Sequence, residues 1–236
     1  MTLVLLAPIA FGASCWEGVP FPDVPTAKHE LPGFGSRARA ATQPTMASLA
    51  AEVAATYDGS LDLVGVSMGG MVAQHVAIDY PERIRSLLVA CTGAVVNPAT
   101  MLARADAAEA EGMEGVLPVT LERWFTPRAL ATSPPHPGVE YARRTLLALA
   151  PSAFADGWRA MAGHDVRDRL SSITAVTTCV AGASDVVGTP ERVRELTAGI
   201  KGAQMVSIEG PHMIQLECPA EFGFVVGEHL ERVRDA

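Results

Sequence analysis

Short apolar runs alternate with longer helical patterns along much of the chain. Each run is continuously apolar, as expected of strands that are covered on both faces of a parallel sheet. The runs cover residues 2–6, 61–66, 84–90, 175–181 and 204–208, with a weaker strand signal at residues 26–30. Helical patterns lie between most of them, so the sequence predicts an α/β fold with a doubly wound, mostly parallel sheet.

Residues at the ends of the helical patterns predict where the helices begin. Thr45 is suited to cap a helix that runs to Ala55, because a threonine hydroxyl can accept a hydrogen bond from a first-turn amide. Pro190 follows Thr189 at the start of another helix, where a proline loses no hydrogen bond. Residues 219–233 form the last predicted helix.

The alternation of strands and helices stops between Val96 and Ile173. This region contains only helical patterns, which prolines separate. They cover residues 99–111, 114–124, 138–150 and 152–162. Ligands of such sheets bind outside the carboxyl ends of the strands, where an insertion forms a lid. We therefore predict a core domain of residues 1–95 and 174–236 and an inserted helical cap of residues 96–173.

Composition and charge narrow the function classes. The 236 residues are 49% apolar and 19% charged, which is ordinary for a globular protein. A net charge of −8 disfavours a nucleic acid or an anionic membrane as partner, and we expect neither. The four cysteines are far apart in sequence, without metal-binding spacing, which predicts no metal site and a cytoplasmic protein.

The apolar segment from Leu3 to Cys15 has some likeness to a signal peptide, since it ends in Ala-Ser-Cys. No Lys or Arg precedes it, however, and the first basic residue is Lys28. We interpret the segment as a core strand followed by a loop. No apolar run is long enough to span a membrane.

The stretch Gly65-Val66-Ser67-Met68-Gly69 has the G-x-S-x-G pattern of a nucleophile elbow. Such an elbow holds a serine on a tight turn, where its hydroxyl is clear of the sheet and a base can reach it. The pattern also occurs by chance in glycine-containing loops. Here a strand pattern precedes it and a helical pattern follows it, which favours Ser67 as a nucleophile.

A serine nucleophile needs a base, and the base needs a carboxylate that orients it. Asp185 follows one predicted strand and His212 follows the next, in the order and context that this fold requires. Asp165 and Asp168 are competing acids. The amide of Met68 and one from the loop after the first strand would form the oxyanion hole. Ile9 is the candidate, because Pro8 has no N–H.

The chain resembles the α/β-hydrolase superfamily over nearly its whole length, and within it the 3-oxoadipate enol-lactonases and similar small serine hydrolases. The likeness lies in Leu31-Pro32-Gly33-Phe34-Gly35-Ser36, in Val66 to Gln74, and in the cap segments 111–113, 122–127 and 164–167. The resemblance implies hydrolysis of an ester or lactone through an acyl-enzyme, without metal or organic cofactor.

The chain departs from that family in two places. The family usually has His-Gly where this chain has Ala7-Pro8, which changes the backbone freedom of the oxyanion loop. The first predicted strand also lacks the strand pair that normally precedes it. One edge of the sheet is therefore expected to be exposed or covered differently.

Each candidate substrate-binding residue has two alternative roles. Trp124 and Phe125 line the acyl pocket or pack the cap. Arg123 or Arg128 pairs with a substrate carboxylate or is a surface residue. A broad short-chain carboxylesterase, a cofactor-free haloperoxidase or lyase, and a non-enzymatic ligand-binding protein are alternative functions on the same fold. The oligomeric state is left open, a homodimer included.

Overall fold

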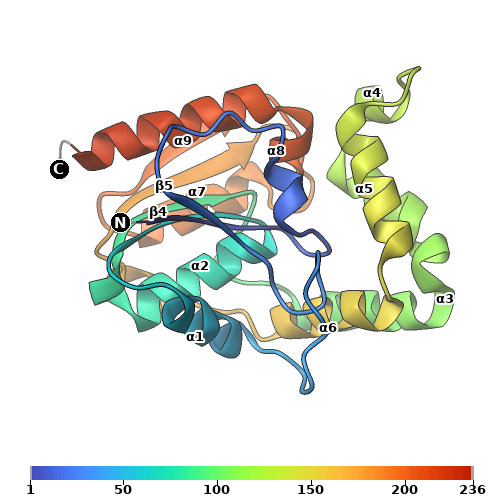
Figure 1. Ribbon diagram of the computed structural model, residues 1–236, viewed down its shortest axis with the longest axis horizontal. Coiled ribbons are helices and arrows are strands. Elements are labelled where there is room, and N and C mark those ends of the chain that lie inside the picture. The colour runs from blue at the N-terminus through green and yellow to red at the C-terminus, as the bar shows by residue number, and fades with distance from the viewer. Residues whose placement is uncertain (1, 235–236) are drawn as a thin grey trace.

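The computed structural model describes residues 2–234, and its centre is a six-stranded sheet with helices on both faces (Figure 1). The strands are β1 (Thr2–Leu6), β2 (Thr26–His29), β3 (Leu61–Val66), β4 (Ile84–Ala90), β5 (Val176–Gly182) and β6 (Gln204–Ile208). Their order is β2-β1-β3-β4-β5-β6, and all neighbours are parallel. The α/β prediction is confirmed, and each strand end lies within one residue of its predicted position.

Burial on both faces explains the continuous apolar runs. Every residue of β3 is buried, including the single charged one, Asp62. Arg85 Nε donates to Asp62 Oδ1 over 2.9 Å, and Ser86 Oγ donates to the same oxygen over 2.7 Å. These bonds offset the desolvation of the carboxylate, because a buried charge is tolerated only when it is paired.

Helices of the sheet domain cover its two faces. They are α1 (Met46–Thr56), α2 (Met68–Asp79), α7 (Pro190–Gly199), the short α8 (Ile214–Glu217) and α9 (Pro219–Arg234). Figure 1 shows α9 on one face and α1 with α2 on the opposite face. The predicted cap of α1 is present, since Thr45 Oγ1 accepts from the Ser48 amide over 3.1 Å. The helix that follows Ser67, α2, packs against β1, β3, β4 and α1.

Four helices lie between β4 and β5, beside one end of the sheet (Figure 1). They are α3 (Pro98–Trp124), α4 (Pro127–Leu130), α5 (Pro137–Ala148) and α6 (Pro151–Ala162). Gly112 has φ 71° and ψ 176° and breaks α3 at a kink, where the two predicted helices meet. The four-residue α4 was not predicted from sequence.

The two connections to these helices are hydrogen-bonded to each other. The Val96 amide donates to the His164 carbonyl over 3.1 Å, and the Val166 amide donates to the Ala94 carbonyl over 2.9 Å. After them, the 3-10 turn Arg167–Ser172 contacts α7 of the sheet domain. The domain division at residues 96 and 173 stays a prediction. At these hydrogen bonds, the chain that enters the four helices lies beside the chain that leaves them.

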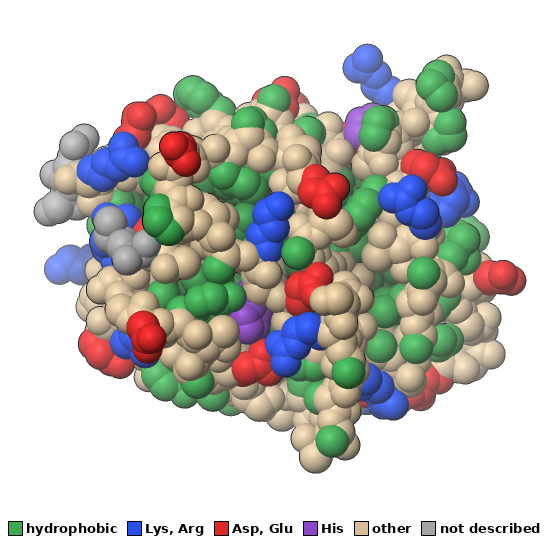
Figure 2. Space-filling model, in the orientation of Figure 1, with side chains coloured by type: hydrophobic (Ala, Val, Ile, Leu, Met, Phe, Trp, Pro, Cys, Tyr) green, Lys and Arg blue, Asp and Glu red, His purple; other side chains and the backbone are tan. Residues whose placement is uncertain are grey.

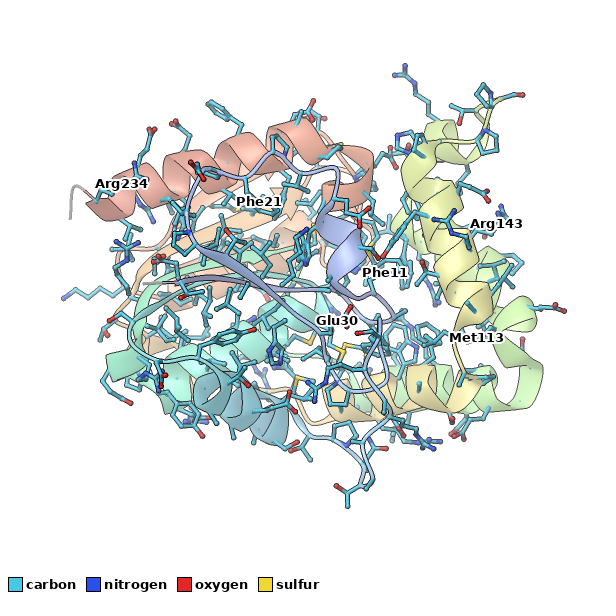
Figure 3. The ribbon with its side chains drawn as sticks, in the orientation of Figure 1. Phe11, Phe21, Glu30, Met113, Arg143 and Arg234 are labelled. Atoms are coloured by element: carbon cyan, nitrogen blue, oxygen red, sulfur yellow. The ribbon has the colours of Figure 1, made fainter. Side chains whose placement is uncertain are left out.

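The loop after β1 contacts these helices. The Phe11 ring lies 5.4 Å from the ring of Trp124 and 5.4 Å from that of Tyr141, centroid to centroid. Figure 3 shows Phe11 on the side of the sheet domain that faces α3 and α5. Aromatic pairs at this spacing add to the burial that holds two elements together.

Glu30 joins the loop after β1 to the turn after β2 (Figure 3). Its Oε1 accepts from the Ala13 amide over 2.8 Å, and its Oε2 accepts from Ser36 Oγ over 2.6 Å and from the Ser36 amide over 3.0 Å. Burial raises the pKa of this carboxyl, but the hydrogen bonds from Ser36 and Ala13 lower it more. The net result is a pKa below the usual value, so the folded protein favours ionised Glu30.

The outer surface is mixed in charge. On the face shown in Figure 2, Lys and Arg side chains are interspersed with Asp and Glu side chains. That face therefore offers no broad basic surface to an anionic polymer. Within residues 2–234, no helix combines the length and the apolar character that crossing a bilayer requires.

We predict that Glu30→Gln lowers the free energy of unfolding by about 1 kcal/mol at pH 7, because an amide replaces a charged acceptor. The depressed pKa stabilises the fold only above the pKa of the unfolded chain, and this stability is lost as pH falls through the lower folded value. Urea unfolding of the wild type and of Glu30→Gln should thus show a difference in the free energy of unfolding that becomes smaller below about pH 4. The exposed Glu231→Gln serves as control, and an equal loss at pH 7 and pH 3 would contradict the role given to the charge.

Candidate active site

Ser67 lies on a strained turn between β3 and α2. Its φ is 52° and its ψ is −116°, a conformation that costs an L-residue about 1–3 kcal/mol. The turn is tightly packed against other backbone. A Cβ atom at Gly65 would lie 2.4 Å from the Gly69 carbonyl oxygen, and one at Gly69 would lie 2.0 Å from the Leu6 carbonyl oxygen. Both positions therefore admit only glycine without a backbone shift.

Three polar side chains meet at the carboxyl ends of β3, β5 and β6. His212 Nε2 lies 2.9 Å from Ser67 Oγ, and His212 Nδ1 lies 2.8 Å from Asp185 Oδ2. All three residues are buried. The sequence separates them widely, but the carboxyl ends of parallel strands share one edge of the sheet. The structure thus joins Ser67, His212 and Asp185 in one hydrogen-bonded series.

The surroundings of Asp185 keep it ionised. Burial raises the pKa of its carboxyl, but the neighbouring His212 and two backbone amides lower it more, so the net pKa is below the usual value. The amides are those of Val187 and Gly188, which donate to Asp185 Oδ1 over 2.7 Å and 3.0 Å. An ionised Asp185 accepts a hydrogen bond from the Nδ1–H of His212, so that Nε2 carries the lone pair and faces the Ser67 hydroxyl.

Two backbone amides near Ser67 have no acceptor among residues 2–234. Met68 is the first residue of α2, where an amide has no partner within the helix. The Ile9 amide likewise donates to no protein oxygen, and the Ile9 side chain lines the same cavity as Ser67. The Pro8 carbonyl accepts from the Phe11 amide over 3.3 Å, closing a turn in which Ala10 has φ 76°. Pro8 is thus accommodated in this loop, and the oxyanion roles of Met68 and Ile9 stay predictions.

A cavity of about 40 Å³ opens beside Ser67 and His212. Loops at the carboxyl edge of the sheet and the helices α3 and α6 both contribute to its wall. Of the three predicted substrate-binding residues, Trp124 lines it. Arg123 instead lines an adjacent cavity of about 330 Å³, and Phe125 is buried but lines neither. Their assignment as substrate-binding residues stays a prediction.

Sequence reasoning missed two arginines that line the cavity with Ser67. Arg104 comes from α3 and Arg192 from α7. One signal in the sequence could have found Arg192. It lies in the first turn of a helix, where the helix dipole disfavours a cation, and directly after the loop that carries Asp185.

The cluster also contains the groups that a metal ion binds. Cys91 Sγ, an oxygen of Asp185 and a ring nitrogen of His212 lie within 4.8 Å of one another. Burial raises the pKa of the Cys91 thiol well above its usual value, and the nearby Asp185 raises it further. Metals bind the thiolate, and His212 already has hydrogen-bond partners on both nitrogens. This donor set therefore fits a metal poorly.

The chain belongs to the Alpha/beta hydrolase family, whose sequence profile matches residues 3–223. It is 31% identical to 3-oxoadipate enol-lactonase 2 of Acinetobacter baylyi over 169 residues, which are 71% of this chain and 62% of that enzyme. The aligned part thus spans less than two thirds of that relative. The chain is also 30% identical to a pimeloyl-[acyl-carrier protein] methyl ester esterase of Neisseria meningitidis, over 78% of this chain and 74% of that one.

The fold is shared with the crystal structure of the enol-lactonase from Burkholderia xenovorans. The TM-score is 0.91 at 23% identity, with 98% of this chain and 91% of that chain covered. At this identity the likeness speaks for the fold alone. The resemblance to the superfamily and to its small lactonases is confirmed by these comparisons together.

We predict that Gly69→Ala destabilises the protein by about 3 kcal/mol or more, because the new methyl group would overlap the Leu6 carbonyl and force backbone apart. Thermal unfolding measures the effect. Gly163→Ala is the matched control, since a Cβ atom there meets nothing within 4 Å. Equal unfolding temperatures for the two variants would show that the elbow is not as tightly packed as described.

Proposed function

We propose that this protein is a serine hydrolase that cleaves an ester or lactone bond of a small substrate through an acyl-enzyme. The observation that carries the proposal is the series Asp185–His212–Ser67, joined by hydrogen bonds of 2.8 Å and 2.9 Å beside a cavity. A weak nucleophile, a base within reach and an orienting carboxylate are what acyl transfer requires.

Each group has a role in the proposed reaction. His212 Nε2 takes the hydroxyl proton as Ser67 Oγ attacks the carbonyl carbon. The Met68 and Ile9 amides donate to the oxygen that becomes negative, which is worth several kcal/mol in the transition state. His212 then protonates the leaving alcohol, and the acyl-enzyme forms. A water that His212 deprotonates releases the acid and restores the Ser67 hydroxyl.

Asp185 acts through His212 rather than on the substrate. Its carboxylate fixes the Nδ1–H tautomer of the imidazole and stabilises the positive charge that appears on the ring during each proton transfer. The two amides that donate to Asp185 Oδ1 support the carboxylate while its Oδ2 accepts from His212. This support comes from the same loop that follows β5.

The size of the cavity supports a small substrate and a cap that moves. A volume of about 40 Å³ holds only a few water molecules, whereas ligand pockets commonly have roughly 300 Å³ or more. We therefore propose that residues 96–173 act as a cap that opens to admit substrate. Support comes from the two connecting segments, residues 94–96 and 164–166, which are hydrogen-bonded to each other where the chain enters and leaves the four helices. We also propose that the protein is cytoplasmic, as the sequence predicts.

A short-chain carboxylesterase is the second candidate. The 30% identity to a methyl ester esterase favours it, while the 31% identity to an enol-lactonase favours the lactone. The same catalytic steps serve both, because a lactone is a cyclic ester whose leaving alcohol stays attached to the acyl group. The two candidates differ in substrate and not in mechanism.

Ser67→Ala should lower kcat/KM for p-nitrophenyl acetate on the order of a thousandfold or more, since no other side chain replaces the nucleophile. Its thermal unfolding should match that of the wild type. A fluorophosphonate probe should label the wild type and not this variant. The exposed Ser60→Ala is the control for both readouts. Undiminished turnover in Ser67→Ala would contradict the proposed mechanism.

The acyl length of the substrate should matter strongly. We predict that kcat/KM falls at least about tenfold from p-nitrophenyl butyrate to p-nitrophenyl decanoate, because the cavity gives a long chain no buried surface. Adding δ-valerolactone and its open-chain ethyl ester to the panel separates the two candidates. A preference for the decanoate would contradict the small-substrate proposal.

A further inference from the structure

The catalytic cavity contains two cations from opposite sides. Arg104 reaches it from α3 of the cap region, and Arg192 reaches it from α7 of the sheet domain. The chain as a whole is acidic, with a net charge of −8. Two arginines beside Ser67 are therefore a local feature and not the result of a basic protein.

Both arginines contact neighbouring residues in the wall of the cavity. Arg104 lies over the ring of Trp158, with its guanidinium carbon 4.8 Å from the ring centroid. Arg192 lies against Gly93, where a Cβ atom would come within 3.3 Å of the Arg192 Cβ. A cation–π contact occupies one face of the Arg104 guanidinium and leaves its in-plane N–H groups available to an acceptor. Arg192 is exposed, so its guanidinium is also open to another group.

No acidic side chain takes up these charges. Among residues 2–234, neither the Arg104 nor the Arg192 side chain makes an ion pair or a hydrogen bond. The carboxylates of α3 nearest in sequence, Asp106 and Glu109, pair with Arg159, over 3.5 Å and 2.7 Å. These two acids of α3 are thus already paired. Glu195 of α7 lines a separate cavity with Arg192 but makes no ion pair with it.

The electrostatic balance at Arg104 favours an incoming anion. Burial, together with the charges of Arg123 and Arg192, lowers its pKa to about 10. Arg104 is still protonated at neutral pH. Two guanidinium groups in one partly enclosed cavity repel each other, and a shared anion would remove that repulsion.

A third donor lies in the same wall. The indole N–H of Trp158 is buried and has no hydrogen-bond partner among the described residues. Trp158 lines the cavity together with Arg104. Buried polar groups nearly always have a partner, so an orphaned donor beside two unpaired cations indicates a site for an acceptor.

We propose that Arg104 and Arg192 bind a free carboxylate of the substrate, so that the enzyme acts on small esters or lactones that carry such a group. The proposal rests on the proposed function. Guanidinium groups match the two oxygens of a carboxylate with paired N–H donors. Because one arginine belongs to α3 and the other to α7, the bound carboxylate also ties the cap region to the sheet domain over Ser67.

The test compares monomethyl succinate with methyl butyrate, which has a similar length and no charge. We expect Arg104→Met and Arg192→Met each to lower the ratio of kcat/KM for the anionic ester to that for the neutral one at least about tenfold. Arg143→Met is the control, since Arg143 is exposed on α5 (Figure 3). An unchanged ratio in both cavity variants would overturn the carboxylate site.

Binding without turnover separates this proposal from the proposed function. Calorimetry on Ser67→Ala should show monomethyl succinate bound at least about tenfold more tightly than methyl butyrate, and the preference should vanish when Arg104→Met is added. If the wild type hydrolyses neither ester while this preference is present, the proposed function fails and the carboxylate site stands. Equal affinity for the two esters overturns the site whether or not hydrolysis occurs.

Discussion

The site depends on how closely β1 passes the first turn of α2. A Cβ atom at position 69 would lie 2.0 Å from the Leu6 carbonyl oxygen, so the two backbones are in direct contact. This contact brings the loop after β1 beside the turn that carries Ser67. The free amides of Ile9 and Met68 thus come from two distant segments that the sheet holds in register. A side chain at position 69 would separate them.

The second determinant is the region that closes over this edge. Residues of α3 and α6 complete a cavity whose other wall is formed by the loops after β4 and β5 and by the first turn of α7. The region is attached through two hydrogen-bonded connections and through Phe11. In the proposed function, this arrangement would keep Ser67, His212 and Asp185 fixed on the sheet while the wall that contacts substrate moves.

The strands and the long helices could be predicted from sequence because each has a local cause. Continuous apolar runs specify buried parallel strands, and Thr45 marks the start of α1 by its own hydroxyl. The break at Gly112 was visible as the gap between two helical patterns. The four-residue α4 was not, because a single turn has no periodicity to detect and depends on the Thr126 cap and on contacts with Glu217.

Sequence alone determined the order of Ser67, Asp185 and His212, since each follows a strand pattern and the carboxyl ends of parallel strands share one edge. Only the tertiary structure decided which arginines face Ser67. Arg104 and Arg123 lie on opposite sides of the kink at Gly112 in α3, and both are partly buried. Arg104 lines the cavity with Ser67 as well as the neighbouring cavity, whereas Arg123 lines the neighbouring one. The direction of a helix face is set by what it packs against, and α3 packs mainly against α6.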